Sequence, residues 1–379
     1  MARSPGLELG GAREAPPVAT SQSILHHDVL LSNYVQHWTP PQKEDGVDWY
    51  LHDELFPVVP VDKASNVFKV INQSTFMQTA RAIVGAKGDV TTVQAYYDPE
   101  GNYVVRPYAL DGVIDYRERA IADDVAMYEQ LNTDLPMTVL ENSLETDAYA
   151  EILNTANLGS NYEVVGNDDM FDNYASLTGN PLLYIRKKCE KVMNVTGRKP
   201  KLVIFDRLVL RALKFHPAVQ MIAPIHTVPA GLQEITIKMI EEKLADVLNP
   251  GSIRVAHFRY DSSSVPKAQG VLAPKSAIGP NLVIVHAEGT SRQDISATKQ
   301  FAFTGNMDVQ GSRLTGESHD AAAPIAAYTY PIYGQGQMGA IGVRVITNRV
   351  FKVVRPTSLF VALGVVDKNN AANYGSELL

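Results

Sequence analysis

Cysteine is nearly absent from the 379-residue sequence, which contains only Cys189. A disulfide framework and a zinc site built from paired cysteines are therefore excluded, and a reducing compartment fits. Long apolar runs are absent too, because no segment approaches the roughly 18 uncharged residues of a membrane span. Residues 1–22 lack the apolar stretch of a secretory signal. We expect neither a signal peptide nor contact with a membrane.

Positive charge is in the minority, since 34 Lys and Arg face 41 Asp and Glu for a formal net charge of −7. The general electrostatic attraction that holds proteins on nucleic acid is therefore missing, and any contact with DNA should be weak. Charged residues are 20% of the chain, below the usual value of about 25%, while 45% are hydrophobic. This balance predicts much surface buried between subunits, in a chain long enough for two or three domains.

Three segments approach catalytic or nucleotide-binding motifs without meeting their requirements. Residues 334–339 match GxGxxG, but a strand-like segment follows them where a dinucleotide fold needs a helix. Residues 270–276 are one residue too short for a P-loop and place Pro274 where a glycine belongs. Residues 318–320 are adjacent Ser, His and Asp, whereas a catalytic triad converges from separated positions. We therefore expect no enzyme activity and no catalytic residues.

Metal-binding patterns are missing as well. No HExxH motif and no His/Cys cluster occurs, so the histidines should be solvated or hydrogen-bonded in ordinary ways. Two aspartate doublets could hold Mg²⁺, but they lie in an acidic stretch where exposure to solvent explains them, at 123–124 and 168–169. We expect no metal and no cofactor.

The chain begins with a region that resembles an arm and continues with β structure. Residues 1–56 mix prolines and aromatic side chains with polar residues, a composition that builds no core of its own but favours docking on something else. From residue 57 to about 119 the period is two, with strands expected at 67–71, 90–97 and 102–105. The turn Asp98–Gly101 separates the last two and predicts a long β-hairpin.

Helices and further strands follow. The pattern predicts a long amphipathic helix from about 134 to 158 with Pro136 in its first turn, and a second helix from Pro181 that ends at Gly197 and buries Cys189. Strands alternate with helices over 181–290, which predicts a compact α/β unit with elements at 202–205, 206–215, 233–248 and 253–260. Long loops should fill 261–325, where only 282–286 and 300–303 are strand-like. Strands at 342–346, 350–354 and 359–366 should return to pair with the early β region.

Charge is segregated along the chain. Residues 111–172 contain 15 acidic residues against Arg117 and Arg119, a net of −13, and residues 186–214 contain ten basic residues against two acidic ones, a net of +8. Two explanations remain open: two solvated faces, or complementary faces on neighbouring subunits. In the second case Arg186, Lys187 and Lys188 are candidate contact residues between subunits.

The order of these elements and several local strings resemble the major capsid proteins of tailed bacteriophages, which have the Hong Kong 97-type fold. The strings are DELFPVVPV at 53–61, YAL at 108–110, ID at 114–115, NP at 180–181, TGRKP at 196–200, LKFHP at 213–217 and YP at 330–331. The resemblance covers most of the chain from about residue 30.

The resemblance implies an α+β fold with five parts: an N-arm at 1–56, an E-loop hairpin with flanking P-domain strands at 57–119, a P-domain with a long spine helix at 120–180, an A-domain with a loop-rich insertion at 181–325, and a returning β segment at 326–379. The hairpin should reach over a neighbouring subunit, which makes Asp98, Pro99, Glu100 and Gly101 near its tip further contact candidates. Some relatives crosslink a hairpin lysine to a neighbouring subunit, and Lys87 lies in this region.

By the same resemblance, the protein is a structural component that assembles as hexamers and pentamers into an icosahedral head. The head encloses the double-stranded DNA of a tailed phage without sequence-specific binding. The protein would reside in the virion, and in the host cytoplasm during assembly. Scaffolding, portal and decoration proteins are possible partners. Because the recognisable part begins so early, a separate scaffolding protein or none is implied.

Two alternatives remain. One is an encapsulin-like shell protein of the same fold, although encapsulins tend to be shorter and to begin with a helix. The other is an α/β hydrolase that uses the 181–290 unit, although each motif considered above fails in its context.

Overall fold

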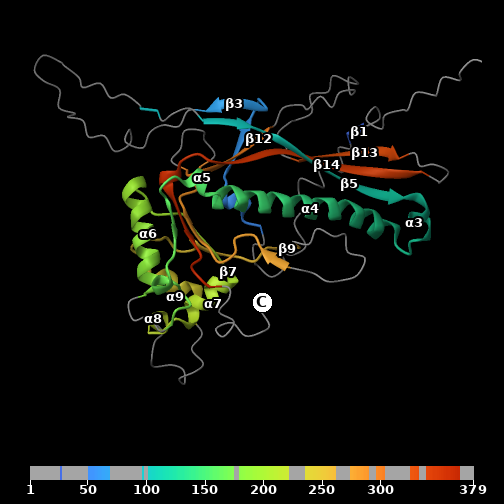
Figure 1. The fold of residues 1–379 in the computed structure, drawn as a ribbon. Coiled ribbons are helices and arrows are strands. Elements are labelled where there is room, and N and C mark those ends of the chain that lie inside the picture. Colours follow the sequence, from blue (N-terminus) through green and yellow to red (C-terminus); the bar gives the residue numbers. More distant parts are fainter. Residues whose placement is uncertain are drawn as a thin grey trace, which may run out of the picture.

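The computed structural model describes ten stretches of the chain: 26–27, 50–68, 96–97, 101–174, 179–221, 235–261, 274–289, 296–303, 325–332 and 339–367. Most of the predicted arm, the turn residues Asp98, Pro99 and Glu100, and Lys87 lie outside these stretches. So do residues 318–320 and most of the two glycine-containing motif segments. The described elements form two large β-sheets with one long helix between them, and two further pairs of strands (Figure 1).

A six-stranded sheet is built around β14 (Ala340–Val353). On one side β14 pairs antiparallel with β5 (Arg106–Asp115), and on the other with β13 (Ile325–Ile332) and β12 (Thr298–Phe303). Two further strands complete the sheet, β2 (Val58–Val61) next to β12 and β1 (His26–His27) next to β13. The predicted return of the C-terminal β segment to the early β region is confirmed for β14, which pairs with β5, but the strand expected at 359–366 belongs to the second sheet. The two strands expected at 342–346 and 350–354 are one continuous strand, however, whose buried side chains alternate along its length.

The second sheet has five strands in the order β6 (Tyr162–Val164), β15 (Leu359–Leu363), β11 (Leu282–Val285), β7 (Leu202–Asp206) and β8 (Ile253–Ala256). All residues of β7 and β11 are buried, as in strands that are covered on both faces. The strand expected at 253–260 is divided into β8 and β9 (Arg259–Asp261), and β9 leaves the sheet to pair with β10 (Pro274–Ser276).

Four helices cover one face of the second sheet: α6 (Pro181–Thr196), α7 (Arg207–Phe215), α8 (Pro217–Gln220) and α9 (Ile237–Lys243). The prediction for α6 is confirmed, because the Asn180 side chain caps its first turn and Gly197 ends it in the left-handed conformation at φ 67°. Helix α9 is shorter than the expected 233–248. Asp206 precedes α7 as expected, but its carboxylate binds Arg259 and makes no capping bond.

The long helix α4 runs from Val125 to Leu153, about 44 Å at 1.5 Å per residue. It lies across both sheets between α3 (Tyr116–Ile121) and α5 (Thr155–Leu158) (Figure 1). The sequence placed its start at about 134, nine residues too late, because Pro136 was taken for a first-turn proline. Asp124 caps the helix instead, by accepting a hydrogen bond from the backbone N–H of Met127. Pro136 therefore lies inside the helix.

The interior proline explains a close approach between α4 and β5. Pro136 has no N–H, so the carbonyl of Asn132 lacks its usual partner in the helix. That carbonyl points at Gly112 of β5, where an added Cβ would lie 2.0 Å from the oxygen. Only glycine fits at this contact between helix and sheet.

The base of the predicted hairpin differs in its pairing. Strand β4 (Gly101–Val104) pairs antiparallel with β3 (Ser65–Phe68), and Gly101 lies opposite Phe68. Gly101 is thus the first residue of a strand and not part of a turn near the hairpin tip. The described partner of β4 is β3, and most of the 90–97 segment that was predicted to pair with 102–105 lies outside the described residues.

We predict that Gly112→Ala lowers the free energy of unfolding by about 2–3 kcal/mol, because the methyl group would force backbone away from backbone. Gly166→Ala is the matched control, since a Cβ there meets nothing within 4 Å and φ is an ordinary −78°. Urea unfolding followed by circular dichroism measures both variants. Equal stability of the two would contradict the close approach of α4 and β5.

Candidate functional site

The predicted basic contact residues lie on α6, where the structure gives two of them partners in the same chain. Arg186 forms ion pairs with Asp246 and, at 3.4 Å, with Glu190. Lys188 pairs with Glu163 of β6 and also lies over the Phe360 ring. Lys187 is exposed, and no ion pair of this residue is found within the described part of the chain. Part of the basic charge is therefore neutralised inside the subunit.

The acidic stretch is not a uniform exposed face. Glu145 and Asp172 are buried, and Asp111 forms a bidentate ion pair with Arg344 at 2.7 Å for each bond. This bond to Arg344 is the main reason why the pKa of the Asp111 carboxyl is lowered. Because Glu163 also pairs with Lys188, the two predicted faces meet partly within one chain. Only the remaining exposed charges are available to another molecule.

The hairpin base has one buried and one exposed apolar face. Phe68 and Tyr103 point inward and pack on Phe301 of β12, with ring centroids 5.1 and 4.5 Å away. Val67 and Val104 point outward and are 51% and 61% exposed. Tyr96 and Tyr97, just before β4 in the chain, are also more than half exposed. The pair β3–β4 thus presents an uncovered apolar surface next to a well-packed anchor.

Near the end of the predicted arm, residues 51–52 are attached to α4 by a buried carboxylate. We call this contact the junction. Glu145 of α4 is completely buried and accepts hydrogen bonds from the backbone N–H groups of Leu51 and His52, at 2.9–3.0 Å. It also contacts Nδ1 of His52 at 3.0 Å. These bonds fix the start of the short helix α2 (His52–Leu55), whose Leu55 enters the same core as the buried face of α4.

His52 is a buried titratable group at this junction. Its Nε2 lies 3.4 Å from oxygens of Asp53 and Glu141 but makes no hydrogen bond. Burial disfavours the charged imidazolium, yet the bond with Glu145 and the surrounding carboxylates outweigh this effect, so the pKa of His52 is raised above 6.5. For Glu141, burial is the main cause of a raised pKa, because it disfavours the charged carboxylate. The surroundings of the junction therefore favour the protonated forms of His52 and Glu141.

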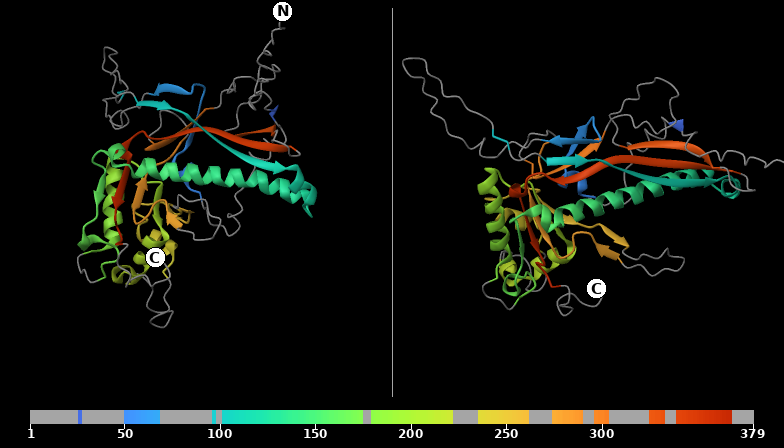
Figure 2. Two further views of the ribbon diagram at one scale, coloured as in Figure 1. Left: turned by 45° about the vertical axis from the view of Figure 1, so that its right-hand side comes forward. Right: turned by 45° about the horizontal axis from the view of Figure 1, so that its top comes forward.

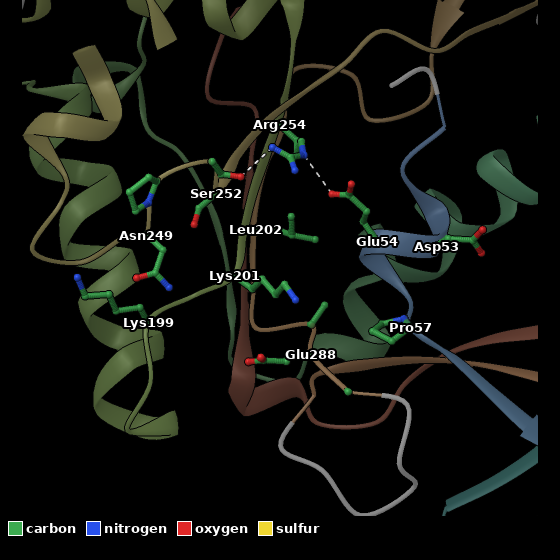
Figure 3. A pocket seen from close by; sticks show the side chains of 14 residues that line it. Asp53, Glu54, Pro57, Lys199, Lys201, Leu202, Asn249, Ser252, Arg254 and Glu288 are labelled. Atoms are coloured by element: carbon green, nitrogen blue, oxygen red, sulfur yellow. Dashed lines mark hydrogen bonds and ion pairs between the residues drawn. The ribbon is translucent and has the colours of Figure 1, made fainter. Parts of the chain in front are cut away.

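A half-open groove of about 510 Å³ lies beside this junction, between α2 and the edge of the second sheet that contains β8 (Figure 3). Its walls come from residues 53–57, 199–202, 249–254 and 287–289. Figure 3 shows Arg254 of β8 joined to Glu54 of α2, an ion pair of 3.1 Å. The lining residues include no His, Cys, Thr or Tyr. The lining contains charges of both signs and the hydroxyl of Ser252.

Cys189 and His216, two further side chains that could be reactive, are buried and packed inside the subunit. Cys189 is packed inside the α6 core, and burial raises the pKa of its thiol to about 12, which makes it unreactive. His216 is buried, and its Nδ1 accepts a hydrogen bond from the backbone of Ala218 at the start of α8. No group of three or more metal-ligating side chains occurs in the described stretches. Gly339 leads directly into β14, as expected for a non-nucleotide loop. None of the helices in the described ranges has the length and apolar character to cross a bilayer.

Sequence reasoning missed the junction of Glu145 and His52. Glu145 was counted as one of many acidic residues, although its place among Leu144, Ala148 and Tyr149 on the core face of the helix was a signal. A carboxylate at a core position of an amphipathic helix needs a buried donor, and the donor here lies more than 90 residues earlier in the chain.

Comparison with known proteins gives a fold but no sequence family. No family model matches the chain, and no curated protein matches it either. Among solved structures, a phage-related protein from Bordetella bronchiseptica matches with a TM-score of 0.62 at 14% identity, over 89% of this chain and 97% of that one. This match shows a shared fold, and the expected Hong Kong 97-type fold is confirmed.

Two further structures match less closely. A virus-like particle from Pyrococcus furiosus has a TM-score of 0.46 at 10% identity, over 88% of this chain and 97% of that one. The capsid of the cyanophage P-SCSP1u has a TM-score of 0.46 at 11% identity, over 84% of this chain and 88% of that one.

We predict that the free energy of unfolding falls as the pH rises above 6.5, because the pKa of His52 is raised in the folded state. A pKa raised in the folded state contributes stability that is complete below the unfolded value of 6.5 and is lost as pH rises through the folded value. His216, His257 and His286 have lowered pKa values, so their contributions change only below 6.5.

Urea unfolding at a series of pH values tests this prediction. The His52→Gln variant should be less stable overall and should lose most of the slope above pH 6.5, whereas a His286→Gln control should keep it. A slope that is unchanged in His52→Gln would show that His52 is not the group responsible.

Proposed function

We propose that this protein is the major capsid protein of a tailed bacteriophage, a subunit that assembles as hexamers and pentamers into an icosahedral head. The observation that carries the proposal is a shell-type fold with apolar surface left uncovered where it extends beyond its own cores, at Val67 and Val104. The shared fold is that of a phage-related protein. An extended strand pair that exposes valines gains stability only when another surface covers it.

In this proposal the chain acts as a structural component and not as an enzyme. The domains are the arm at 1–56, the hairpin and its flanking strands at 57–119, the spine-helix domain at 120–180, the axial domain at 181–325 and the returning strands at 326–379. Figure 2 shows the two sheets and α4 from two further directions, with the α6 domain at one end of α4. The subunit would enclose double-stranded DNA without sequence-specific binding, in agreement with its net charge of −7.

The proposal places the protein in the virion, and in the host cytoplasm during assembly. Scaffolding, portal and decoration proteins would be its partners. Among the basic contact candidates on α6, Lys187 is the one best suited to reach a neighbour, because Arg186 and Lys188 already have partners in their own chain. Exposed pairs contribute only about 0–1 kcal/mol each, but a shell repeats each contact many times.

We expect purified subunits to form discrete hexamers and pentamers and then closed shells. Multi-angle light scattering gives the masses of the oligomers, and negative-stain electron microscopy shows the shells. A protein that stays monomeric or dimeric under all assembly conditions and turns over a small substrate would refute the proposed function.

We expect Val67→Thr/Val104→Thr to fold normally but to assemble poorly. Threonine keeps the β-branched shape, while each lost apolar contact costs roughly 1 kcal/mol at every interface. Val164→Thr is the matched control, because Val164 is a 70% exposed strand valine far along the chain from the hairpin. Light scattering compares the rates of assembly. Normal shells from the double variant would place the exposed hairpin face outside the contacts between subunits.

A further inference from the structure

Helix α4 carries a second apolar surface that its own chain does not use. Met127, Leu131, Leu135 and Val139 follow one another at intervals of four residues and are 69%, 61%, 59% and 41% exposed. We call these four residues the α4 ridge. Side chains at i, i+4 and i+8 lie side by side on a helix, so the ridge is a continuous feature and not four scattered residues.

The ridge lies away from the sheet. The buried side chains of the same helix, among them Met137, Leu140 and Leu144, face the core under β5 and β14. Figure 1 shows β5 and β14 along one side of this half of α4. A surface helix normally has one apolar stripe, whereas the first half of α4 has two. Large side chains exposed together in this way mark an interaction site.

The charge around the ridge is negative. Asp123 and Asp124 precede it and are exposed, and Glu129 and Asp134 lie on the same half of the helix. The neighbouring cations are Arg117 of α3, which is exposed, and Arg119 of α3, which pairs with Glu129 at 2.7 Å. Six acidic residues against these two leave residues 115–134 with a net charge of −4. An occupant of the ridge therefore needs apolar side chains for the centre and positive charges for the border.

Within the described residues, helices α4 and α6 of a second copy meet that need poorly. Two α4 ridges facing one another would bring their acidic borders together. The basic helix α6 presents the exposed cation Lys187, but it offers no matching apolar ridge, because its exposed apolar side chains Leu183 and Val195 are twelve residues apart.

We propose that the α4 ridge is the docking site for a basic amphipathic helix of a separate polypeptide. Ridges of the i±4 type pack into one another with helices crossing at about −50°, and the occupant presents apolar residues at i, i+3, i+4 and i+7 between lysines or arginines. The inference rests on the proposed function in one respect, namely that a shell subunit has assembly partners. The ridge adds the chemistry of one such partner.

The probe is a synthetic helical peptide of about 18 residues, or about five turns, with leucines at those positions and lysines beside them. It is titrated against the full-length protein, and hydrogen exchange reports protection at 127–139. Leu131→Gln/Leu135→Gln should weaken binding at least tenfold, whereas Leu183→Gln, a control at another exposed helix leucine, should not change it. A peptide with glutamates in place of the lysines should bind at least tenfold more weakly.

Equal binding of both peptides, or of the wild type and the double variant, would overturn the proposal. Assembly of the double variant separates this result from the proposed function. If the variant forms shells as the wild type does, the ridge is free for another polypeptide. If the wild type forms shells and the folded variant does not, the ridge is a contact between copies and the proposal is wrong. If the wild type forms no shells, the peptide titration still tests the ridge.

Discussion

Both sheets of this protein pack against one element, the buried face of α4. That face joins side chains from the six-stranded sheet, such as Val345, to side chains from the five-stranded sheet, such as Ile204, in one apolar cluster. Segments more than 200 residues apart are thereby held in register, because β5 and β14 pair directly over the helix. The close contact at Gly112 shows how little space this packing leaves.

Around this centre the two kinds of surface have different physical characters. In the interior, the buried carboxylate of Glu145 is held by the backbone N–H groups of Leu51 and His52 and by Nδ1 of His52. The periphery leaves apolar side chains uncovered on β3–β4 and on the first half of α4. Burying apolar surface is the main favourable term in association, so these peripheral sites are where a structural subunit would gain its contacts.

The candidate contact residues show what a charge pattern in the sequence can predict and what it cannot. The sequence shows a basic cluster at 186–188, and α6 does present it. It does not show that Lys188 meets Glu163 or that Arg186 meets Asp246, because those partners come from other elements. The α4 ridge was missed for a related reason. Many helices have apolar residues on both sides. Only the packed structure shows which side is buried and that the other side is exposed.

By itself the sequence determined those helices and strands that are marked by capping residues or by a run of apolar residues within the element. Asn180–Pro181 and Gly197 bound α6, the apolar run at 202–205 forms a buried strand, and the single cysteine lies in a core. Tertiary structure decided what depends on distant partners. Pro136 is accommodated in the middle of α4 because Gly112 of β5 leaves room for the Asn132 carbonyl, which has no N–H partner in the helix. Tertiary structure also paired β4 with β3. It also buried Glu145, since a carboxylate leaves water only when donors are brought to it, and here the fold brings them from the end of the arm.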